Sequence, residues 1–78
     1  MPVAFVFINA ETGAEDEIMK ELRRIPEIKE AYAVYGVYDI VAKVEAEAMD
    51  KLRETIARKV RKVDGIRSTL TMVAMEGR

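Results

Sequence analysis

The sequence contains no cysteine and no histidine. Without cysteine, a chain of 78 residues has no disulfide to supplement a small core. The usual zinc ligands, a Cys–His pair and a Ser–His–Asp triad are all missing as well. The glycines Gly13, Gly36, Gly65 and Gly77 are isolated, so no phosphate-binding loop is present. We therefore expect no enzyme activity, no metal and no cofactor.

The sequence also lacks long apolar runs and a large excess of basic or acidic residues. No apolar segment approaches the roughly 20 residues that span a bilayer, and the N-terminus does not resemble a signal peptide, which predicts a cytoplasmic protein. The 13 basic and 14 acidic residues nearly cancel, whereas a general nucleic-acid binder normally has a basic face. Gln is absent and Asn9 is the single Asn. Together with many Lys and Glu residues, this is typical of a thermophile.

What the chain does contain is apolar residues, which make up half of it. A domain this short buries only about 60% of its unfolded surface, so its own core is marginal. We expect a single domain, residues 1–78, that gains its missing stability by associating with further copies.

The first third of the chain predicts a strand and then a helix. Residues 3–8 are apolar and of β type, which indicates a strand. Thr12 and Glu15 have the spacing of a capping box, so the helix is expected to start with Thr12 as its cap. One apolar stripe follows at i, i+4 and i+7, and Pro26 ends the helix. The stripe consists of Ile18, Leu22 and Ile25.

The rest of the chain predicts a hairpin, a second helix and a last strand. Strands are expected over residues 28–35 and 38–45, joined across Gly36 and Val37. The second helix should run from about 47 to 63, with Gly65 as its C′ residue. Its apolar face is formed by Leu52, Ile56, Val60 and Val63. The last strand is expected over 66–75, with 76–78 as a frayed end.

A weak internal repeat supports this order. A shift of 38 positions pairs Val3 with Val41, Ala4 with Ala42 and Ile18 with Ile56. Each half is then one βαβ unit, and two such units make the split-βαβ arrangement. The predicted fold is therefore α+β and ferredoxin-like, βαββαβ, with a four-stranded antiparallel sheet and both helices on one face.

Successive residues of a strand point to opposite faces of the sheet, and the two sets of alternate residues, the two parities, predict two different faces. Small and aliphatic residues suit the helix side; these are Ala4, Val6, Ile8, Ala42, Val44 and Ala46. The opposite parity is also largely apolar, and an open face of this kind marks an interface. We expect dimerisation through the sheet with Val3, Phe5, Phe7 and Val41 in the interface. The alternative is that the parity is wrong and these residues are core, but two helices cannot cover both faces of a sheet.

Two polar groups interrupt the apolar strands. Asp39 follows the hairpin link, where its carboxylate could accept an ammonium group or bond turn amides, as Asp commonly does. Arg67, Ser68, Thr69 and Thr71 lie at the start of the last strand. They could hold a carboxylate, or they could reflect β propensity and cross-strand Thr pairing. The residues alone leave the two interpretations of Asp39 open and favour β propensity and cross-strand pairing for the Arg67 group.

The segments GVYDIV (36–41) and VDGIRSTLT (63–71) resemble the effector-binding domain of the Lrp/AsnC transcription regulators, also called the RAM domain. The family pattern is a G-x-Y-D hairpin, a helix, and a glycine entering a strand with alternating Ser or Thr. The resemblance implies a dimeric α+β barrel, formed by sheets paired face to face, that assembles further into tetramers or octamers. It also implies a free amino acid bound between subunits by Gly36, Tyr38, Asp39, Ser68, Thr69 and Thr71. Val37 departs from the polar residue often found in this loop.

The resemblance has one further implication. Full-length family members carry an N-terminal helix-turn-helix domain, whereas the first strand here begins at Val3. We expect a stand-alone effector domain with no direct DNA binding, which senses an amino acid by itself or co-assembles with full-length regulators. Two rivals share the fold order. A monooxygenase-like barrel enzyme usually recruits a His or Trp that is missing here, and an ACT-like amino-acid-binding module has a Gly-rich loop that residues 9–13 match only faintly.

Overall fold

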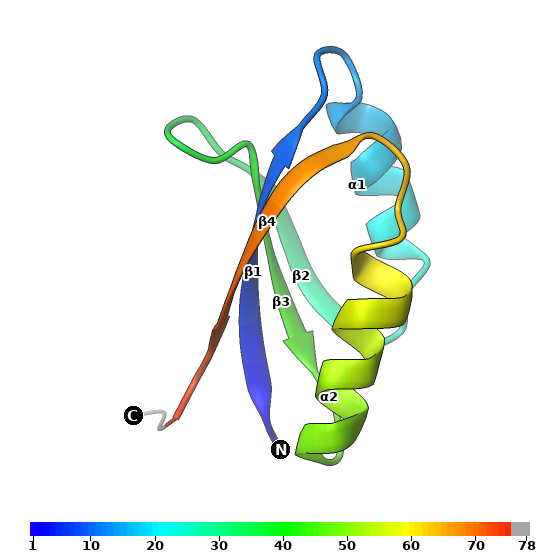
Figure 1. Cartoon of the computed structure of the whole chain (residues 1–78), viewed down its shortest axis with the longest axis vertical. Helices are drawn as coiled ribbons and strands as arrows, with labels where there is room; N and C mark the ends of the chain where they lie inside the picture. Colours follow the sequence, from blue (N-terminus) through cyan, green and yellow to red (C-terminus); the bar gives the residue numbers. More distant parts are fainter. Residues whose placement is uncertain (76–78) are drawn as a thin grey trace.

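The computed structural model describes residues 1–75. Its elements follow the order β, α, β, β, α, β that the sequence predicts (Figure 1). They are β1 (Val3–Ala10), α1 (Glu15–Arg23), β2 (Ile28–Ala33), β3 (Ile40–Glu45), α2 (Met49–Thr55), η1 (Ile56–Val60) and β4 (Ile66–Val73). The segment η1 is a π-helical turn that continues α2 without a break. The frayed end expected at 76–78 lies outside the described residues.

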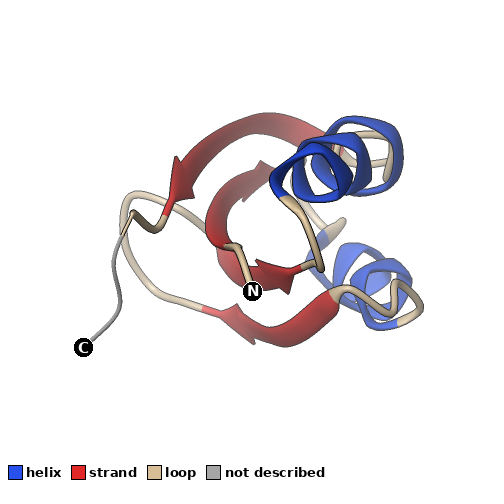
Figure 2. Ribbon diagram, turned by 90° about the horizontal axis from the view of Figure 1, so that it is seen from below, coloured by secondary structure: helices blue, strands red, loops and turns tan. Residues whose placement is uncertain are grey.

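The strands form one antiparallel sheet in the order β2-β3-β1-β4. Figure 2 shows the sheet strongly curved, with both helical segments on the same side of it. The predicted fold class, ferredoxin-like α+β with both helices on one face, is therefore confirmed.

The core lies between the helices and one parity of the central strands. In the β1–β3 ladder, Ala4 lies opposite Val44, Val6 opposite Ala42 and Ile8 opposite Ile40. None of these side chains is accessible to solvent. The helices cover them with the stripes expected from the sequence, of which Ile18, Leu22, Ile25, Leu52, Ile56 and Val60 are buried. The helix-side parity is confirmed.

The capping box expected at the start of α1 is wrong. The helix begins at Glu15 with Ala14 as its N-cap, and no side-chain cap is formed. Thr12 lies in the preceding turn, where Gly13 has a φ of +83° and the Ala14 N–H donates to the Glu11 carbonyl at 2.9 Å. This backbone turn moves the helix start beyond the reach of the Thr12 hydroxyl.

The role expected for Gly65 at the end of the second helix is also wrong. The helix ends at Val60 with Arg61 as the C-cap, so Gly65 belongs to the connection that leads into β4. Its φ of +94° favours glycine, and a Cβ there would lie 2.8 Å from the Cβ of Ala14. The Glu11 N–H donates to the Gly65 carbonyl at 2.7 Å. Gly65 thus allows this connection to approach the start of α1 closely.

The hairpin link is longer than the sequence predicts. β2 ends at Ala33 and β3 begins at Ile40, so residues 34–39 form the loop. The Val34 N–H closes it by donating to the Asp39 carbonyl at 2.8 Å. The loop therefore ends on the residue that the sequence singles out for ligand binding.

Candidate ligand-binding site

One face of the sheet carries no helix, and we call it the open sheet face. Because residues directly opposite each other in an antiparallel ladder point to the same side, the register defines rows across this face. One row is entirely apolar and consists of Tyr32, Val41, Phe7 and Leu70. The next consists of Glu30, Lys43, Phe5 and Met72. The residues predicted for a dimer interface, Val3, Phe5, Phe7 and Val41, all lie on this face.

The open sheet face also holds a group of paired charges. The Lys43 ammonium lies 3.5 Å from Glu30 and 3.9 Å from Glu45, and the Tyr32 hydroxyl donates to Glu30 at 2.6 Å. This hydrogen bond and the nearby Lys43 lower the pKa of Glu30, and the same bond raises the pKa of Tyr32. The face therefore combines apolar rows with charges that are already paired within one subunit.

Asp39 connects the hairpin loop to the central strand of the sheet. Its Oδ2 accepts a hydrogen bond from the Ala10 N–H at 2.8 Å, and its own N–H donates to the Ile8 carbonyl at 2.9 Å. Of the two interpretations of Asp39, bonding to backbone amides is thus observed, although the amide belongs to β1 rather than to the hairpin. Within residues 1–75, no hydrogen bond to its Oδ1 is formed.

Three more polar or aromatic groups gather near Asp39. The Asn9 side chain donates to the Ser68 hydroxyl at 3.3 Å, and the two residues lie opposite each other in the β1–β4 ladder. The Tyr38 ring packs on Phe7 with centroids 5.6 Å apart. We call this group, Asn9, Tyr38, Asp39 and Ser68, the Asp39 end of the open sheet face. Asn9 is absent from the predicted ligand residues, although its parity with Phe5 and Phe7 could have placed it there.

The remaining predicted ligand residues lie elsewhere. Thr69 is opposite Ile8 and Thr71 is opposite Val6, so both point to the helix side of the sheet. Gly36 lies in the exposed part of the hairpin loop. Tyr38, Asp39 and Ser68 therefore each contact β1, whereas the two threonines point to the helix side.

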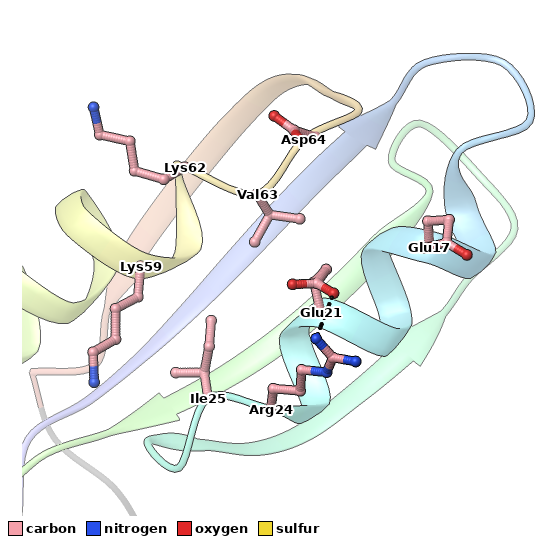
Figure 3. Close-up of a pocket in the computed structure, with 8 residues that line it drawn as sticks. All are labelled: Glu17, Glu21, Arg24, Ile25, Lys59, Lys62, Val63 and Asp64. Carbon is pink, nitrogen blue, oxygen red and sulfur yellow. Dashed lines mark ion pairs between the residues drawn. The ribbon is translucent and has the colours of Figure 1, made fainter.

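A cavity of about 550 Å³ lies between the two helices, on the opposite side of the molecule from the open sheet face (Figure 3). Its walls carry both signs of charge, with Glu17 and Glu21 on α1, Arg24 as the C-cap of this helix, and Lys59 and Lys62 across from them. Arg24 already pairs with Glu21 at 3.3 Å. No residue predicted to bind a ligand lines this cavity.

Residues 1–75 form neither a cluster of metal ligands nor a membrane-spanning helix. That part of the chain contains no group of three or more acidic, His or Cys side chains able to hold a metal ion. None of its helices is both long and apolar enough to cross a bilayer.

Residues 3–77 match the model of the family described as the Lrp/AsnC ligand binding domain. The chain belongs to the Lrp/AsnC family. Over 71 residues it is 37% identical to the uncharacterized HTH-type transcriptional regulator PYRAB01370 from Pyrococcus abyssi, covering 91% of this chain and 45% of that protein. The chain thus spans about half the length of the curated relatives it matches, and these include regulators from thermophilic archaea.

Solved structures of this family have the same fold. FFRP-DM1 is 43% identical with a TM-score of 0.91, and the match covers 96% of this chain and all of that one (100%). Escherichia coli AsnC is 28% identical with a TM-score of 0.85, and the match covers 97% of this chain and 52% of that one. The resemblance drawn from the hairpin and the last strand is confirmed.

Proposed function

We propose that this Lrp/AsnC domain binds a free amino acid at the Asp39 end and self-associates through the open sheet face. The observation that carries the proposal is a pair of hydrogen bonds at the end of β1: Asn9 donates to Ser68, and the N–H of the next residue, Ala10, donates to Asp39. Curated relatives named as transcriptional regulators support a regulatory rather than a catalytic role.

The Asp39 end has the chemistry that a zwitterion requires. The free Oδ1 of Asp39 supplies an anion for the ammonium group, and the Ser68 hydroxyl and the Asn9 amide supply donors for the carboxylate. Tyr38 and Phe7 border the site with an aromatic surface for the ligand side chain. A regulator from Neisseria meningitidis, NMB0573, has been solved with this fold as a complex with L-Met.

Self-association is supported by what the open sheet face exposes. Phe5 is 37% exposed, Leu70 41% and Met72 52%, and they lie in adjacent rows. Contiguous apolar surface of this kind marks an interface. A second copy is the occupant that the small core calls for, because a chain of 78 residues is marginal alone. The proposed assembly is a dimer paired sheet to sheet, with further association of dimers into tetramers or octamers.

Amino-acid binding is tested by calorimetric titration with each standard amino acid, and then with the D39N variant. Asn keeps an oxygen that accepts from the Ala10 N–H, so the fold is retained while the charge is lost. We expect affinity to fall by about tenfold or more, since a hydrogen bond to a charged group contributes about 1.5–3 kcal/mol. The control is D16N, which removes the same charge from the exposed first turn of α1. Unchanged affinity in D39N, or no binding by the wild type, refutes the proposed site.

We also propose that the domain co-assembles with full-length regulators of the family. The part of PYRAB01370 that matches this chain has an equivalent sheet, so its open face can replace that of a second copy. Co-expression with such a regulator, followed by purification through a tag on one partner, should yield a mixed complex. Recovery of the tagged partner alone contradicts co-assembly and leaves amino-acid binding untouched.

A further inference from the structure

Two cavities on the helix side of β4 share a single residue, Arg61, and together we call them the β4 groove. One has a volume of about 240 Å³ and lies at the start of β4, beside Arg67 and Thr69. The other has a volume of about 310 Å³ and lies between Thr71 and the α2–η1 helix. Figure 1 shows the helix and β4 diverging from the segment that connects them. Residues of both elements line the lower cavity.

Among residues 1–75, the β4 groove is lined by arginines and by no acidic residue. Arg53, Arg61 and Arg67 line it, and neither cavity is lined by an Asp or Glu from residues 1–75. Within the same residues none of these arginines lies within 4 Å of a carboxylate, whereas Lys59 pairs with Glu27 at 3.3 Å. Unpaired guanidinium groups with no nearby carboxylate favour an anion. A ligand with an ammonium group would find no partner here.

Hydroxyl donors stand next to these arginines. Thr69 and Thr71 are two residues apart on β4 and therefore point to the same side of the strand. Ser68 also borders the upper cavity. A planar anion such as a carboxylate can accept from the Arg61 fork and from a threonine hydroxyl at the same time.

The lower half of the groove is apolar. Leu52 and Ile56 form its floor and are buried, while Ala57 and Val73 border it from opposite sides. This surface suits a short aliphatic chain attached to the anionic group. The cationic and apolar parts together require a ligand that is anionic at one end and aliphatic at the other.

We propose that the β4 groove binds an aliphatic monocarboxylate, such as a branched 2-oxo acid. Its carboxylate contacts Arg61 and the threonines, and its tail lies on Ile56 and Val73. The groove lies on the helix side of the sheet, and Ser68 is the one residue that it shares with the Asp39 end. It therefore forms a second site that discriminates by charge between a keto acid and the amino acid of the same skeleton, and it does not depend on the amino-acid site.

The experiment is a titration with 4-methyl-2-oxopentanoate, followed by calorimetry and by amide chemical shifts in the wild type, R61Q and R58Q. Arg58 lies in the π-helical turn η1, which Arg61 caps, but it lines a different cavity, so R58Q removes the same charge without touching the groove. We expect R61Q to lose at least about tenfold in affinity and R58Q less than about twofold. The shifts should concentrate at residues 61 and 69–73 rather than at 36–39. Unchanged melting temperatures show that both variants fold.

Three results would overturn the proposal. Equal losses in R61Q and R58Q indicate general attraction to a positive surface. Equal affinity for inorganic phosphate shows that the aliphatic tail is not recognised. Equal affinity for 4-methylpentan-2-one, which lacks the carboxylate, shows that the anionic group is not recognised. Leucine binding that disappears in R61Q but persists in D39N means that this groove is the amino-acid site itself. By contrast, loss of leucine binding in D39N alone leaves the groove proposal unaffected.

Discussion

The substitution L70E tests whether the open sheet face is an interface. Leu70 belongs to the entirely apolar row across the sheet and lies opposite Phe7. A glutamate there keeps the backbone ladder but places a carboxylate in the middle of the face. In a two-fold dimer the change occurs twice, once in each subunit.

The expected magnitude follows from the exposure of the side chain. Leu70 is 41% exposed in the single chain, and complete burial of a leucine contributes about 1.5–3 kcal/mol. Covering the exposed part is therefore worth about 1 kcal/mol per subunit, or about 2 kcal/mol per dimer. This corresponds to a dissociation constant of the dimer that is about 30-fold higher. Removing two carboxylates from water weakens the dimer further. The folded monomer should lose only about 1 kcal/mol.

The assay is sedimentation velocity over a concentration series, with circular dichroism to verify the fold. The control is T71E, which introduces the same charge at the next position of the same strand but on the helix side. We expect L70E to shift the dimer–monomer equilibrium toward monomer and T71E to leave it in place. Wild-type and L70E chains with the same dissociation constant would refute sheet-to-sheet pairing.

Two further predictions concern stability. G65A combines a positive φ with a Cβ 2.8 Å from that of Ala14, whereas G13A has a positive φ and open space around the added Cβ. Urea unfolding should therefore show that G65A is destabilised by about 1–3 kcal/mol more than G13A. Equal losses of stability in the two variants would contradict the close approach. A hydrogen bond from its own backbone N–H, and then Lys59, lower the pKa of Glu27. The Glu27 carboxylate therefore stabilises the fold above its ordinary pKa of 4.5, and this stabilisation is lost as the pH falls through the lowered pKa. E27Q should therefore be less stable than the wild type at pH 7 and equal to it near pH 2, and a pH-independent difference would refute this assignment.

The sheet faces could be predicted from sequence because burial acts on every second residue. Ala4, Val6 and Ile8 repeat with period two, and a slip by one position would move the whole set to the other face. The helix stripe of Ile18 and Leu22 follows in the same way from the helical period. These parts of the fold depend on many residues that agree with one another.

The ends of the helices could not be predicted, because single contacts decide them. Thr12 has the right spacing for a capping box, yet the turn at Gly13 places it outside the helix. Gly65 follows the basic end of the second helix, yet the chain leaves the helix at Val60 and uses the glycine to approach Ala14. Contacts between residues that are distant in sequence leave no local pattern.

The candidate site shows the same division. The hairpin motif points to the neighbouring residues Tyr38 and Asp39, but motif spacing cannot tell which face of β4 a residue occupies. The alternation of the strand separates Ser68 from Thr69, and the ladder adds Asn9 as the partner of Ser68. The composition of the site therefore depends on the register between strands.

Because β4 alternates its side chains, one strand carries both the open sheet face and the β4 groove. Leu70 and Met72 belong to the first surface, and Thr69 and Thr71 belong to the second. A displacement of the strand would move both sets at once, so we predict that the proposed binding in the groove and the proposed association of subunits are linked through one backbone segment. Such linkage is reciprocal: a ligand that strengthens association by a given factor is itself bound more tightly by the same factor in the assembled form.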